Sequence, residues 1–123
     1  MSLIHKFTGN MEGFSWENVV REELGEEGLQ SISKTVLISE TEKAQNFFMR
    51  YFQVGPNGHS RLERHPQEHE VIVVHGKGQV RIAEDVYDVE PFDVVFIEGN
   101  ELHQFSNTNN ESFGFLCIIP NLT

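Results

Sequence analysis

Three residues near the middle of the sequence are spaced so that their side chains can meet. Glu63, His65 and His69 lie just before an apolar run that ends in two glycines. Side chains two residues apart in an extended strand project from the same face, so Glu63 and His65 are expected to point the same way. Pro66 cannot continue a central strand, and the corner it forms is expected to return His69 beside them on a neighbouring strand. One carboxylate and two imidazoles would then converge.

A further histidine, His103, follows a Gly-Asn turn in the second half of the chain. Three neutral imidazole nitrogens and one carboxylate oxygen suit divalent first-row metal ions, so we predict a site for manganese, iron, zinc, nickel or copper. Four protein ligands leave coordination positions free for water, oxygen or substrate, as in reactive sites. The predicted ligands are Glu63, His65, His69 and His103.

Two other interpretations of this group stay open. The Glu63 carboxylate could pair with Arg61 or Arg64 instead, which would leave a site of three histidines. The whole group could also be a set of surface polar residues around a loop that binds no metal.

The first segment resembles a motif of the cupin family, His-x-His-x3-Glu-x6-Gly. When the two are aligned on Gly76, Glu63 stands at the first histidine of the motif and His65 at the second. His69 stands at the glutamate, so the positions match while two residue types are exchanged.

The second segment resembles the other cupin motif, Pro-x-Gly-x2-His-x3-Asn. His103 and Asn107 keep its spacing, but Glu98 replaces the proline and Asn100 the glycine. These departures change the residues of the turn and leave His103 at the ligand position.

Two shorter stretches resemble a subset of small single-domain bacterial cupins. That subset reads His-Pro-x-Glu-His-Glu before an apolar run, as at 65–70, and ends in Phe-Leu-Cys-Ile-Pro, as at 115–120 with one extra isoleucine. The motifs and this ending together cover about half of the chain.

The rest of the sequence is typical of short strands separated by turns. With the resemblance, this predicts an all-β fold, the double-stranded β-helix or jelly-roll barrel of the cupins, in a single domain. We expect residues 1–30 to form a leading segment packed on the barrel and residues 31–123 to form the barrel itself. The acidic stretch 21–27 is expected to be a solvated loop. The predicted strands are Thr35 to Ser39, Phe47 to Val54, Ser60 to His65, His69 to His75, Gln79 to Ala83, Val86 to Val89, Val94 to Ile97, Leu102 to Ser106 and Phe113 to Ile119.

Strand periodicity also predicts what surrounds the metal. Val71 and Val73 share a face with His69 and, together with Phe105, are expected to form an apolar wall that limits water entry. His75 has the same periodicity and could face the cavity. Because it ends the strand, a position at the rim of the cavity is predicted equally well.

Two reactive side chains have simpler interpretations. Arg50 could anchor a substrate carboxylate if it faces inward, although a solvent-facing salt bridge is favoured. Cys117 lies in an apolar stretch without basic neighbours in sequence, so we expect a small buried hydrophobe rather than a nucleophile.

Composition limits the partners. Nine lysines and arginines against 19 acidic residues give a formal charge of −10 in 123 residues, which disfavours nucleic acids and anionic membranes. No stretch reaches the roughly 20 apolar residues of a membrane span, and a single cysteine allows no intrachain disulfide, so a cytoplasmic protein is expected. The resemblance implies a homodimer that binds a small molecule.

Function is predicted only as a class. The resemblance allows dioxygenases, isomerases, lyases and binding modules, because fold alone does not choose between activities. The leading hypothesis is a metal-dependent enzyme that acts on a small oxygenated organic molecule. The alternative is a non-catalytic, metal-containing module that binds or senses a small ligand.

Overall fold

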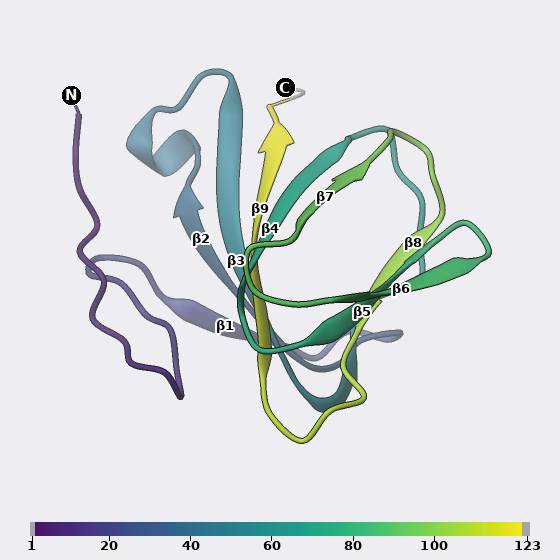
Figure 1. Cartoon of the computed structure of the whole chain (residues 1–123). Coiled ribbons are helices and arrows are strands. Elements are labelled where there is room, and N and C mark those ends of the chain that lie inside the picture. The colour runs from purple at the N-terminus through teal and green to yellow at the C-terminus, as the bar shows by residue number, and fades with distance from the viewer. Residues whose placement is uncertain (1, 122–123) are drawn as a thin grey trace.

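Nine strands of one curled sheet make up most of the computed structural model, which describes residues 2–121 (Figure 1). One short 3-10 turn, η1 (Glu40–Glu42), follows the second strand. This architecture confirms the predicted all-β jelly-roll fold. The strands are β1 (Arg21–Leu24), β2 (Gln30–Ile38), β3 (Phe47–His59), β4 (His69–His75), β5 (Gly78–Ile82), β6 (Asp85–Val89), β7 (Val94–Ile97), β8 (His103–Ser106) and β9 (Phe113–Pro120).

The order of the strands curls the sheet around an interior. Hydrogen-bonded neighbours run β6-β5-β8-β3-β9-β4-β7, while β2 pairs with β3 and β1 pairs with β2. The long strand β3 contacts β2, β8 and β9, and it runs with β9 through the middle of Figure 1. The two strands that begin with a candidate ligand, β4 and β8, therefore lie on opposite sides of β3 and β9.

Alternating burial shows which face of each strand looks inward. In β4, His69, Val71 and Val73 are buried and Glu70 is exposed. The inward face of β9 buries Phe115 and Cys117 in the same way, and both belong to the hydrophobic core. A strand with one face on the core has this period of two, which is why periodicity predicted the central strands well.

One predicted strand is wrong. Residues 60–65 form no strand, although Glu63 makes an isolated bridge with His103. Side chains take part in the bonding here: the Phe105 amide donates to Ser60 Oγ at 2.8 Å, and Gln104 Nε2 donates to the Ser60 carbonyl at 2.9 Å. The regular ladder between backbones is interrupted for that reason.

The stretch before β3 also differs from expectation. Arg21–Leu24 forms β1 instead of a solvated loop, and β2 begins at Gln30, ahead of the predicted Thr35. Farther upstream, Phe14 stacks on Tyr51 with ring centroids 5.4 Å apart. The division of the chain at residue 30 stays a prediction. Among the described residues, no helix has the length and apolarity that a membrane crossing needs.

Candidate metal centre

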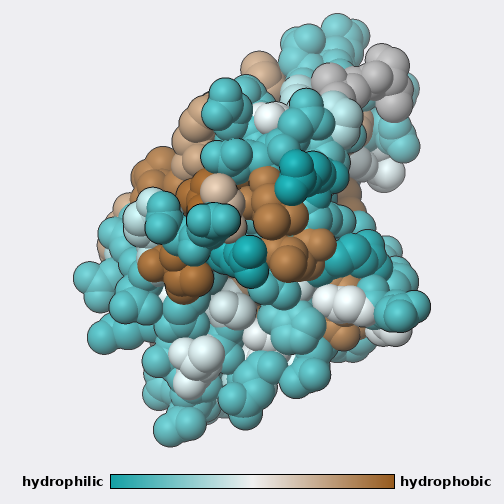
Figure 2. All heavy atoms as spheres, turned by 90° about the vertical axis from the view of Figure 1, so that its right-hand side faces the viewer, coloured by the Kyte–Doolittle hydropathy of each residue, from teal (hydrophilic) through white to brown (hydrophobic). Residues whose placement is uncertain are grey.

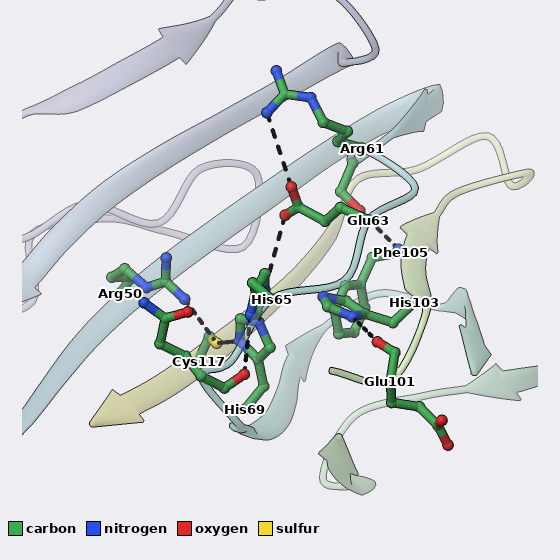
Figure 3. Close-up of polar contacts among 11 residues, drawn as sticks. Arg50, Arg61, Glu63, His65, His69, Glu101, His103, Phe105 and Cys117 are labelled. Atoms are coloured by element: carbon green, nitrogen blue, oxygen red, sulfur yellow. Dashed lines mark hydrogen bonds and ion pairs between the residues drawn. The ribbon is translucent and has the colours of Figure 1, made fainter. Parts of the chain in front are cut away.

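The imidazoles of His65, His69 and His103 meet inside the curled sheet (Figure 3). Their ligand atoms all lie within 4.8 Å of one another, and their ring centroids are 4.7 to 5.0 Å apart. His69 opens β4, His103 opens β8, and His65 lies in the loop before β4. The structure thus brings together the three predicted histidines, from segments far apart in the sequence.

Backbone carbonyls hold two of these rings in a fixed orientation. His65 Nδ1 donates to the Gln67 carbonyl at 3.0 Å, and His103 Nδ1 donates to the Glu101 carbonyl at 2.9 Å. A carbonyl oxygen only accepts, so in the neutral rings the proton sits on Nδ1 and the Nε2 lone pair is free. This is the usual arrangement of a metal-binding histidine.

The remaining spacing also fits an ion. His69 Nε2 and His65 Nε2 are 2.9 Å apart. Two nitrogens bound to one ion at about 2.1 Å, in adjacent positions, would be separated by about 3 Å. Burial lowers the pKa of His69 to about 3, and the charges of Arg50 and the other two histidines act in the same direction. His69 is therefore a neutral imidazole near neutral pH, which is the form that binds metal.

Glu63 lies beside this cluster but has two possible partners. One carboxylate oxygen is 3.9 Å from His65 Nε2 and the other is 3.9 Å from Arg61 Nη1, as the dashed lines in Figure 3 show. Reciprocal backbone hydrogen bonds of 3.1 and 2.9 Å join Glu63 to His103 and fix its place at the rim. Arg64 forms no ion pair within residues 2–121. The role of Glu63 as a fourth ligand stays a prediction.

The turn after β7 supports the cluster despite its departures from the cupin motif. Asn100 has φ 66°, a left-handed conformation that asparagine tolerates better than most residues. Its amide donates to the His65 carbonyl at 2.7 Å. A side chain on Gly99 would collide with the Pro66 carbonyl oxygen. Asparagine thus takes the place of the usual glycine, and the turn packs directly against the loop that carries His65.

Cys117 is part of the site, which sequence reasoning missed. The residue is 1% exposed, as expected of a buried hydrophobe. Its sulfur, however, lies 2.8 Å from His69 Nδ1 and accepts a hydrogen bond from Arg50 Nη2 at 3.2 Å. Burial raises the pKa of the thiol, and the Arg50 charge acts in the opposite direction. The pairing of β9 with β4 makes this contact, and no local pattern around Cys117 announces it.

A cavity of about 400 Å³ opens onto the histidines. The predicted wall is only partly correct, because Phe105 lines the cavity while Val71 and Val73 belong to the core behind it. Stacked aromatic rings take their place: Phe115 lies 4.3 Å from Phe105 and 5.5 Å from Phe52, between ring centroids. The polar residues around the cavity are Glu26, Lys34, Arg50, Ser60, Arg61, Glu63, Gln67 and the three histidines.

Two other candidates have clear positions. Arg50 is half-buried and lines the cavity, and its guanidinium carbon lies 5.0 Å from the centroid of the Phe52 ring. The favoured salt bridge is absent, since no carboxylate within residues 2–121 pairs with Arg50. His75 packs against Phe14, with ring centroids 5.2 Å apart, and does not line the cavity.

Comparison with known proteins supports the fold and finds a relative that is named as an enzyme. The Cupin domain family matches residues 50–119, more than half of the chain. The chain is similar to a Rhodospirillum rubrum protein named 1-methylthio-D-xylulose 5-phosphate methylsulfurylase, with 38% identity over 109 residues, 86% of this chain and 69% of the relative.

Solved structures give the same result. A cupin-2 domain from Rhodospirillum rubrum is 34% identical and superimposes with a TM-score of 0.82 over 95% of this chain and 83% of that one. The polyketide cyclase RemF from Streptomyces resistomycificus is 25% identical, with a TM-score of 0.80 over 98% of this chain and 79% of that one.

Proposed function

This chain belongs to the Cupin domain family, and on that premise we propose that it is a metal-dependent enzyme acting on a small, oxygen-rich organic molecule. One observation carries the proposal: three imidazoles converge, with their ligand atoms within 4.8 Å, at a cavity of about 400 Å³. A site that opens into a space of this size can hold a small molecule as well as an ion. A purely structural metal site would be closed.

The residues around the cavity have distinct tasks in this proposal. A divalent ion held by His65, His69 and His103, with Glu63 as fourth donor, would supply Lewis-acid polarisation of a substrate oxygen. The stacked rings of the cavity wall keep water away from the reacting atoms. Cys117 Sγ lies 2.8 Å from His69 Nδ1, and Cys117 lines the cavity. It is therefore our candidate for moving a proton to or from the bound molecule.

The relative from Rhodospirillum rubrum suggests which molecule to try first. Its name describes a methylthio-substituted ketose phosphate as the substrate. Such a compound is small and rich in oxygen, so it fits the predicted class. We propose 1-methylthio-D-xylulose 5-phosphate as the first substrate to test, with dioxygenase, isomerase and lyase reactions as the wider range.

Metal content tests the site directly. We expect about one transition-metal ion per chain by elemental analysis of the untagged protein, and its loss in His65→Ala. The matched control is His59→Ala, because His59 Nδ1 bonds the Ser60 carbonyl and, within residues 2–121, the residue does not line the cavity. Protein that stays empty when supplied with manganese, iron, nickel, copper or zinc would overturn the proposed metal site.

Turnover then separates the enzyme from a binding module. We expect the loaded protein to consume 1-methylthio-D-xylulose 5-phosphate, or a related hydroxylated ketose phosphate, and the His65→Ala variant to be inactive. Loaded protein that binds these compounds without converting them would support the non-catalytic alternative and contradict the enzyme proposal.

A further inference from the structure

Arg50 is a partly buried cation without an anionic partner. Its Nε is buried and has no hydrogen-bond partner within the described chain. The hydrogen bond that it does make goes from Nη2 to the sulfur of Cys117, a weak acceptor. A guanidinium has five N–H donors, and leaving a partly buried charge this poorly paired costs stability. The missing acceptor is most simply supplied by a ligand in the cavity that Arg50 lines.

A second cation, Lys34, lies next to Arg50 on the same face of the sheet. In the β2–β3 register Lys34 stands opposite Phe52, and Val36 stands opposite Arg50. Lys34 and Arg50 are therefore diagonal neighbours, at a spacing of about 7 to 8 Å along the backbone. Both line the cavity, and Lys34 has no ion pair or side-chain hydrogen bond within residues 2–121.

The other charged residues of the cavity do not neutralise this pair. Glu63 is engaged with Arg61 and His65, and Arg61 also donates to the Glu27 carbonyl at 2.9 Å. Glu26 reaches the cavity but forms no ion pair with either cation. In a chain of formal charge −10, two adjacent cations without partners in one cavity are unusual for a solvated surface.

We propose that Arg50 and Lys34 form an anion subsite that binds the phosphate group of a phosphate monoester substrate. This inference rests on the proposed function and adds the residues that would bind the phosphate group of its substrate. A carboxylate would be satisfied by the guanidinium fork alone, whereas the three terminal oxygens of a phosphate can also engage a separate ammonium group. The Phe52 ring beneath the guanidinium holds the fork in place.

The position of the subsite sets the size of the substrate. Arg50 Nη2 contacts Cys117 Sγ, and the same sulfur contacts His69 Nδ1, so a single side chain separates the guanidinium from the imidazole cluster (Figure 3). A short phosphate monoester can therefore reach both, with phosphate on the cations and hydroxyl or carbonyl oxygens toward the histidines. A molecule of this kind fits the cavity of about 400 Å³.

Binding of inorganic phosphate to the full chain stripped of metal with EDTA tests the subsite without the ion. We expect saturable binding in calorimetry and a shift of the Arg50 Nε–H resonance in the NMR spectrum of the native protein. Arg50→Met should weaken phosphate binding by about tenfold or more, and Lys34→Met by about threefold or more. The matched control is Lys77→Met, which removes the same charge from an exposed turn and should leave binding unchanged.

Each outcome decides the proposal. Circular dichroism shows whether the variants are folded. The NMR measurement uses the native protein, so it tests the subsite even if Arg50→Met does not fold. Unchanged affinity in both Arg50→Met and Lys34→Met, or no shift of the Arg50 resonance, would overturn the subsite. Acetate binding as tightly as phosphate would overturn the assignment to phosphate. Because the test needs neither metal nor turnover, a failure of the proposed enzyme activity would leave its result unaffected.

Discussion

At the scale of single residues, the site depends on which ring nitrogen of each histidine is held by a neighbouring group and which one is left free. Backbone carbonyls hold Nδ1 of His65 and His103, and Cys117 holds Nδ1 of His69. Each Nε2 is thereby directed to the same point. The exchange of glutamate and histidine relative to the cupin motif keeps this arrangement, because it changes the donor types at two positions and keeps the positions themselves.

Glu63 gives the sharpest test at this scale. We expect Glu63→Gln to lower metal affinity by on the order of tenfold or more, because it removes the negative charge beside the imidazoles. Competition with a chelating dye measures this affinity. The matched variant is Arg61→Met, which removes the ion pair of 3.9 Å together with the hydrogen bonds to the Glu27 carbonyl, keeps the Glu63 carboxylate and should not weaken metal binding. Equal metal affinity in the parent chain and Glu63→Gln would instead indicate a site of three histidines.

At the scale of elements, the packing between β3 and β9 holds both sides of the site together. Arg50 and Cys117 are directly opposite in the β3–β9 register, and Val71 pairs with Cys117 on the other side. On the outer face of the same strands, Gly114 leaves space for the buried Tyr51 hydroxyl, which donates to Gln53 at 3.3 Å.

Gly114→Ala should therefore destabilise the protein. The added methyl would collide with the Tyr51 hydroxyl oxygen, and such overpacking costs about 1 to 3 kcal/mol. Urea denaturation measures the free energy of unfolding. The control is Gly25→Ala, since a methyl there meets no atom within 4 Å. Tyr51→Phe should recover part of the loss in the double variant; additive losses would show that the two residues do not interact.

Whether a strand could be predicted from sequence depends on whether one of its faces is buried. β4 and β9 bury one face, so apolar residues at alternate positions identify them. β1 has three exposed charged residues and one apolar residue, and its strand conformation depends on pairing with β2 instead of on its own pattern. Residues 60–65 form no strand, because the Ser60 hydroxyl accepts from the Phe105 amide and the Ser60 carbonyl accepts from the Gln104 side chain in place of a regular ladder.

The site was predictable in its ligands and not in its surroundings. The histidines stand in motifs with a recognisable spacing, so three could be placed together from sequence. The contacts of Cys117 and Arg50 depend on the pairing of β9 with both β4 and β3, which brings together residues far apart in the chain. The residues next to Arg50 in sequence carry no sign of this pairing, so sequence alone predicts a solvent-facing salt bridge for Arg50.

At the scale of the whole molecule, one outer face carries exposed apolar side chains. Val94 and Phe96 of the edge strand β7 are 74% and 56% exposed, and Phe47 of β3 is 66% exposed. Figure 2 shows hydrophobic surface among hydrophilic groups on the side of the molecule where β6 and β7 lie. A groove of about 360 Å³ lies on the outer face of β3, β4 and β9 and is lined by Ile38, Phe47, Phe48, Met49, Glu70 and Ile118.

The groove and the edge strand are continuous. In the strand registers Phe96 lies opposite Glu70, Glu70 opposite Ile118, and Ile118 opposite Met49. Within the described chain β7 pairs only with β4, so its other edge offers unpaired backbone groups. We propose that a second copy of the chain covers this face, which would give the homodimer that the family resemblance implies.

Sedimentation equilibrium tests the dimer. We expect twice the 14.1 kDa of one chain for the parent protein. Phe96→Asp should shift the mass toward one chain, because it places a charge in an apolar contact that would have to lose its water. Val20→Asp is the matched control, since Val20 is 79% exposed and lies before β1, outside the groove. A parent protein that sediments as a monomer, or a Phe96→Asp variant that stays dimeric, would contradict an interface on this face.

The metal content of the Phe96→Asp variant should equal that of the parent protein, because Phe96 is outside the metal cavity. A loss of metal together with the loss of the dimer would mean that the partner copy supports the site.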